Sequence, residues 1–183
     1  MLHAAPAGGL EVRRADDGGA VLTGRFPYDT TAVLGRFSGR ERRETFAAGA
    51  LRPAGEVHLL AQHDFARPLA STGAGTLTVR NGADGLTFEA RIAPAVAETS
   101  HARDALALIA AGEARGLSPG FTVPPGGDEV TAAGDALIRT VKRAELVELS
   151  IVTRPAFSEA QVEARSWKPT RARAPRPAAC RWL

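Results

Sequence analysis

The feature that most constrains the fold is the stretch "AELVELSIVTRP" at residues 144–155, which has the alternation of a strand but is apolar on both faces. One face would carry Val147, Leu149 and Ile151, and the other Leu146, Glu148, Ser150 and Val152. Since side chains point alternately to the two faces of a strand, a strand that is apolar on both must be covered on both. The stretch therefore predicts a strand buried on both sides in a β-rich domain.

Most of the other patterned segments also read as strands. Alternating apolar residues bounded by turn residues predict strands at 20–28 and 56–64, a hairpin at 75–93, and two strands or one long bent strand at 136–155. The hairpin turn contains "NGADG", whose residues tolerate positive φ.

One strong helix is predicted at residues 97–116, with Gly112 or Gly116 as its end. Weaker segments are assigned as a short helix or turn at 41–51, a loop at 124–135 and a last short helix at 156–165. The expected fold class is α+β and rich in β, with a barrel as one arrangement of the strands.

The domain organisation follows from length and charge. The 183 residues suit one domain, which we place at 19–164 after a flexible N-terminus at 1–18. No acidic residue follows Glu163, and residues 165–183 form a basic, Pro-rich segment that we expect to be disordered. Contact of this tail with nucleic acid or an acidic surface and a merely solvated tail are both open.

The cellular location is also constrained. The one cysteine, Cys180, allows neither a disulfide framework within the chain nor a cluster of cysteine metal ligands, and it suits a reducing compartment. The first residues lack the pattern of a signal peptide, and no apolar run approaches the ~20 residues of a membrane span. A soluble, intracellular protein without a cofactor or metal is expected.

Glu148 is the first candidate site residue, because it is an acid in an apolar strand. Burying a carboxylate costs several kcal/mol unless a partner meets it. Arg139 or Arg143, in the preceding strand, would make a structural ion pair. The other interpretation is a partner in an active site.

His63 and Ser118 are the other candidates. His63 ends an apolar strand before a loop, where catalytic groups concentrate, although a histidine at such a place often bonds only to backbone. Ser118 lies between glycines in "ARGLSPGFTV". A serine becomes a nucleophile when a base takes its proton and a third group holds that base. By residue type alone this triad is weak evidence.

Several short sequence motifs, taken together, are more specific evidence of function than the residue types. The chain contains "RRETFAAGAL", "LLAQHDFARPLAST", "GTLTV" with "DGLTFEARI", "GEARGLSPGFTV" and "AELVELSIVTRPAFSEAQV". In this order and spacing they resemble the tailed-phage prohead proteases, the serine proteases of capsid maturation, over roughly residues 20–163.

The resemblance implies a compact β-barrel with surrounding helices, similar to the herpesvirus maturation proteases. It implies an endopeptidase inside the immature prohead, in the bacterial cytoplasm, that removes the scaffolding segment of the major capsid protein and usually cleaves itself. By position, Ser118 resembles the nucleophile, His63 the general base and Glu148 the residue that orients the imidazole. A homodimer is expected by analogy with the herpesvirus enzymes.

Pro119 departs from the family pattern, which more often has an aliphatic residue after the serine. Proline has no N–H, so an oxyanion hole would need a donor from Gly120 or another loop. We also hypothesise that Pro119 holds Ser118 in a strained, exposed conformation.

Two other functions are consistent with the sequence. One is a non-catalytic capsid-assembly or scaffold-binding factor on the same fold, which a serine-reactive probe would leave unlabelled. The other is a nucleic-acid-binding module that acts through the basic tail, with binding that weakens steeply as salt rises.

Overall fold

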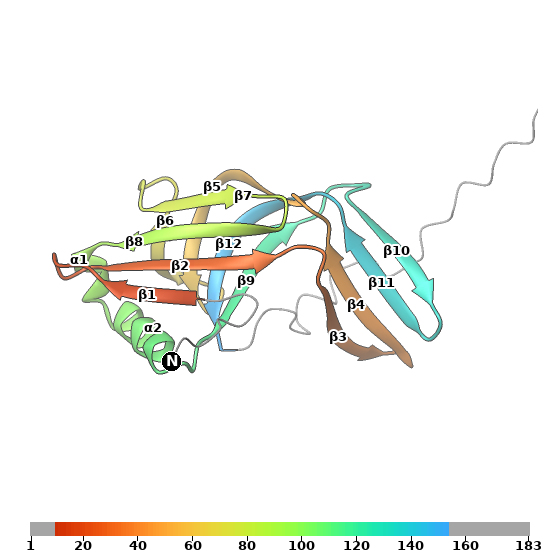
Figure 1. Cartoon of the computed structure of the whole chain (residues 1–183), viewed down its shortest axis with the longest axis horizontal. Coiled ribbons are helices and arrows are strands. Elements are labelled where there is room, and N and C mark those ends of the chain that lie inside the picture. The colour runs from red at the N-terminus through yellow and green to blue at the C-terminus, as the bar shows by residue number, and fades with distance from the viewer. Residues whose placement is uncertain (1–9, 154–183) are drawn as a thin grey trace, which may run out of the picture.

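A computed structural model describes residues 10–153, which form twelve strands and two short helices (Figure 1). The helix expected at 156–165 and the tail at 165–183 lie outside the described residues. Strand β1 (Leu10–Arg14) pairs with β2, so regular pairing begins inside the N-terminal segment expected to be flexible. No helix within the described residues is long and apolar enough to cross a membrane.

The strands form three four-stranded sheets. The first sheet has the order β1, β2 (Ala20–Pro27), β8 (Gly85–Ile92), β7 (Leu77–Asn81), and the second has β10 (Asp128–Ala133), β11 (Ala136–Val141), β4 (Arg40–Phe46), β3 (Thr31–Phe37). The third sheet has the order β6 (Asp64–Ser71), β5 (Leu51–Ala61), β12 (Ala144–Val152), β9 (Gly116–Thr122). The helices are α1 (Pro94–Ala97) and α2 (Ser100–Ala110).

The β-rich α+β class is confirmed, but the compact barrel is not found: the pairing of the described strands leaves three separate sheets. Figure 1 shows the first and third sheets together, with the second extending to one side. The first and third sheets share one core that includes Leu22, Phe88, Leu59 and Ile151, and Ile109 of α2 joins it. They are therefore held together by packing rather than by a closed ladder.

Aromatic side chains connect the second sheet to this core. Phe46, at the end of β4, makes edge-to-face contacts with Phe26 at 5.3 Å and Phe121 at 5.0 Å between ring centroids. Edge-to-face pairs at such distances contribute about 1 kcal/mol each beyond the apolar area that they bury. This contact fixes the second sheet against the strand that carries Ser118.

The predicted strand at 20–28 and the hairpin at 75–93 are confirmed, and residues 136–155 contain two strands up to Val152. The strong helix is confirmed but shorter, and Gly112 follows its end with a φ of 72°.

The segments at 41–51 and 124–135 were assigned wrongly, since they contain strands β4 and β10. Neither strand has the alternating apolar pattern used to predict strands, because both contain several charged or polar residues. Buried Arg139 of β11 bonds Glu44 of β4 at 3.0 Å and Asp128 of the adjacent strand β10 at 2.5 Å, so ion pairs between neighbouring strands satisfy these charges.

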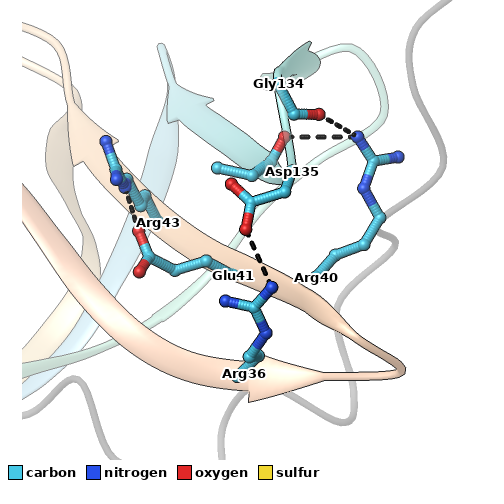
Figure 2. A network of polar contacts seen from close by, with 7 residues as sticks. Arg36, Arg40, Glu41, Arg43, Gly134 and Asp135 are labelled. Atoms are coloured by element: carbon cyan, nitrogen blue, oxygen red, sulfur yellow. Dashed lines mark hydrogen bonds and ion pairs between the residues drawn. The ribbon is translucent and has the colours of Figure 1, made fainter.

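A polar network joins the two hairpin ends of the second sheet (Figure 2). Arg36 bonds the Asp135 carboxylate at 2.8 Å, and Arg40 donates to the carbonyl of Gly134 at 3.0 Å. Arg36 also lowers the pKa of Asp135. The arginines at this end are therefore engaged within the sheet rather than gathered as an open anion-binding patch.

Tyr28, the one tyrosine of the chain, makes the stability depend on pH at the alkaline end. Its hydroxyl donates to Asn81 Oδ1 at 2.6 Å, and burial raises its pKa to about 12 from 10.0. The unfolded chain therefore loses this proton first, and the tyrosine's contribution is present below pH ~10 and lost as pH rises towards the folded pKa.

We expect the free energy of unfolding to fall by up to about 3 kcal/mol between about pH 10 and pH 12 through this residue. Denaturant unfolding across this range, followed by far-UV circular dichroism, measures the fall. Tyr28→Phe should flatten the curve, and an equally steep curve in that variant would contradict the assignment.

Candidate active site

A β-bulge in β12 sets the direction of Glu148. The pairing of β12 with both neighbours shifts register between Leu146 and Glu148, and Val147 is left 38% exposed. The extra residue lets Leu146 and Leu149 both reach the core. The sequence placed Leu146 and Val147 on the wrong faces, because strict alternation does not allow for a bulge.

Beyond the bulge, β12 is buried on both sides as predicted. Leu149 and Ile151 lie in the core, so Glu148 and Ser150 point to the opposite face. Glu148 is 4% exposed and Ser150 is fully buried.

Ser118 lies in the middle of β9 and pairs directly with Ser150. Residues opposite each other on adjacent strands share a face, so Ser118 lies on the same face as Ser150 and Glu148. Ser118 is fully buried in a regular register, so the strained, exposed conformation expected there is wrong.

His63 reaches this face from a tight turn. Gln62 and His63 form the two-residue connection between β5 and β6, with φ values of 58° and 59°. Two left-handed residues match a type I′ hairpin turn, although Asn-Gly is the usual pair. The unusual backbone is therefore at the histidine rather than at the serine.

The three side chains lie in one hydrogen-bonded line. His63 Nε2 is 2.7 Å from Ser118 Oγ, and His63 Nδ1 is 2.7 Å from Glu148 Oε1. An ionised carboxylate only accepts, so the imidazole donates its Nδ1 proton to Glu148 and Nε2 accepts from the serine hydroxyl. The structure thus brings together all three residues that the sequence singled out.

The structural ion pair considered for Glu148 is not formed. Arg139 bonds Glu44 and Asp128 instead, and the described partners of Glu148 are His63 and Ser150. The sequence did not assign a role to Ser150. The signal was available, because Ser150 lies two residues after Glu148, on the same face of the predicted strand.

Gly120 makes room for the carboxylate. It pairs with Glu148 across the β9–β12 ladder, and a Cβ atom there would lie 2.1 Å from Glu148 Oε1 and 2.8 Å from its Cγ. A glycine is therefore required at position 120, because the Glu148 side chain lies where a Cβ atom would be.

We expect Gly120→Ala to displace Glu148 and to lower the rate at which a serine-reactive probe labels Ser118 about 100-fold, with a loss of about 1–3 kcal/mol in the free energy of unfolding. Gly127→Ala is the matched control, because its Cβ would lie 2.4 Å from the carbonyl oxygen of Arg143, away from this site. Rates per folded molecule should separate the two variants. Equal activity in both would contradict this role of Gly120.

Pro119 restricts the backbone donors of β9. It pairs with Leu149, and because proline cannot donate, the neighbouring pairs of Ser118 and Gly120 carry the ladder hydrogen bonds to β12. The Gly120 N–H therefore points into the sheet, which does not support it as an oxyanion donor. A donor from another loop remains the expectation.

Among the described residues, no group of three or more histidine, cysteine or acidic side chains is arranged to hold a metal ion. The hydroxyl, imidazole and buried carboxylate instead give the arrangement typical of serine hydrolases.

A family model of the caudovirus prohead serine proteases matches residues 9–173. The chain belongs to this family, which confirms the resemblance seen in its motifs and makes it a serine protease of phage capsid maturation. Searches of curated proteins and of solved structures gave no match.

Proposed function

We propose that Ser118, His63 and Glu148 form the catalytic triad of an endopeptidase that cuts the scaffolding segment from the major capsid protein. The observation that carries the proposal is the pair of 2.7 Å contacts that His63 makes, one with each of the other two. Self-cleavage belongs to the same proposal, and so does action inside proheads in the bacterial cytoplasm.

The proposed reaction uses the two ring nitrogens differently. Ser118 Oγ attacks the scissile carbonyl carbon while its proton passes to His63 Nε2. The imidazolium is stabilised by Glu148, and it gives the proton to the leaving amine as the C–N bond breaks. Water then attacks the acyl-enzyme, with His63 again as the base, and releases the new carboxylate and the free serine.

A second function, a non-catalytic assembly factor, is favoured by one observation. Ser118 is fully buried, so attack requires that the hydroxyl become accessible when substrate binds. A fluorophosphonate probe separates the two functions, because an operating triad is labelled at Ser118 and an assembly factor is not.

The experiment that tests the substrate is intact-mass spectrometry of the cognate major capsid protein, produced with and without this chain. We expect a single internal cut, present only when the chain is present. The same spectra of the chain itself report self-cleavage. If Ser118 is labelled but the capsid protein stays uncut, the proposed substrate is wrong and the proposed triad still stands.

The fold relationship to herpesvirus proteases and the homodimer are proposals by analogy. An experimental structure tests the first and sedimentation tests the second. The domain limits at 19 and 164 and contacts of the basic tail stay predictions.

A further inference from the structure

We propose that Ser150 is a positioning residue that holds the general base and its carboxylate in a productive arrangement. The inference rests on the proposed function of Ser118, His63 and Glu148. Ser150 is fully buried on β12, where its register partners are Ser118 on β9 and Leu60 on β5. It therefore lies directly beside the proposed nucleophile, in a position that solvent does not reach.

The Ser150 hydroxyl closes a ring of hydrogen bonds. It donates to Glu148 Oε2 at 2.6 Å and accepts the backbone N–H of His63 at 3.0 Å. The His63 side chain completes the ring through Nδ1 and Glu148 Oε1 at 2.7 Å. One hydroxyl thus ties the backbone of the proposed base to the carboxylate that orients its ring.

Both roles of the hydroxyl are used, which fixes directions as well as distances. A serine hydroxyl has one hydrogen to donate and lone pairs to accept. Since the hydrogen goes to Oε2, Oε1 stays available for the Nδ1 proton of His63. Nε2 is then left as the acceptor for Ser118, which is the tautomer that base catalysis needs.

The turn that carries His63 explains why such a tie is needed. Residues held in the left-handed region without glycine cost of order 1–3 kcal/mol each and persist only where their surroundings over-determine them. Gln62 donates its backbone N–H to the carbonyl of Ile151 at 3.0 Å, and His63 donates to Ser150. Without the Ser150 hydroxyl, the second of these bonds is lost at the residue whose placement matters most.

The test is the rate at which a fluorophosphonate labels the full chain, resolved into a maximal rate and a half-saturating probe concentration. We expect Ser150→Ala to lower the maximal rate about 10–100-fold and to leave the half-saturating concentration nearly unchanged, because the base moves and the probe's binding surface does not.

Ser71→Ala is the matched control. Ser71 is also buried in the third sheet, but its hydroxyl accepts from the backbone N–H of Ala74 in a turn, whereas that of Ser150 bonds to His63 and Glu148. The control should lose stability without a comparable loss of the maximal rate.

An isosteric pair keeps the test decisive if Ser150→Ala fails to fold. Ser150→Thr retains the hydroxyl and Ser150→Val replaces it with a methyl group of similar size. The threonine variant should retain a labelling rate at least tenfold above that of the valine variant. Equal rates in the two would overturn the inference.

An NMR signature adds a readout that a structural role would not move. The Nδ1 proton that His63 donates to Glu148 should resonate far downfield in the wild type and in Ser71→Ala, and should shift or broaden in Ser150→Ala. An unchanged resonance and rate in Ser150→Ala would overturn the role of Ser150 alone. Labelling that persists in Ser118→Ala would instead overturn the proposed function.

Discussion

Replacing Ser118 with alanine should lower cleavage of the capsid protein by about 10⁴-fold or more, with little change in stability. The hydroxyl is the proposed nucleophile and lies 2.7 Å from His63 Nε2, the nitrogen that would take its proton. Its removal takes away one buried hydrogen bond, which contributes only about 1 kcal/mol to folding. The measurement is the rate of appearance of the cut capsid protein, by mass, at equal amounts of folded chain.

Non-additivity is the control for this prediction. His63→Ala should cost about as much as Ser118→Ala, and the double variant should cost no more, because residues that act as one unit are lost together. If the two losses multiplied, the residues would act independently. If cleavage by Ser118→Ala persisted at the wild-type rate, the assignment of the nucleophile would fail.

The fold was predictable wherever one local pattern determined the structure. The hairpin at 75–93 combines alternating apolar residues with turn-forming residues. The helix has one apolar face and a glycine just after its end. The two missed strands, β4 and β10, are different. The charge of Glu44 is tolerated because Arg139 of a neighbouring strand meets it, and no local pattern shows which distant residue will do so. The bulge before Glu148 was likewise invisible to a strict alternation.

The candidate site was predictable in its residues but not in its geometry. Ser118, His63 and Glu148 were candidates from their places in the sequence, but their roles came from the resemblance, since residue types alone left Glu148 and His63 with structural alternatives. The turn at Gln62 and His63 was missed because neither residue is a typical turn former, and its positive φ values are stabilised by contacts with β12. Gly120 was considered as a donor, whereas its role is to leave space for Glu148.

Glu148→Gln is the second change with a large expected effect. The amide has nearly the size of the carboxylate, so the fold should persist, but it is neutral and carries two N–H donors on one side. We expect cleavage to fall by roughly 10³–10⁴-fold, comparable to the loss when the acid of a serine protease triad becomes an amide. The rate of capsid protein cleavage by mass measures the effect.

Ser150 decides which way the amide in Glu148→Gln will face. The Ser150 hydroxyl donates to Oε2, so the new carbonyl oxygen should take that position and the NH₂ group should face His63 Nδ1. Nδ1 must then accept, and the ring proton moves to Nε2. A protonated Nε2 can no longer take the proton of Ser118.

Glu44→Gln is the matched control, because it neutralises another buried glutamate that is paired with Arg139. It should lower stability and leave the rate per folded molecule unchanged, and a Glu148→Gln variant within tenfold of wild type would exclude Glu148 from the triad.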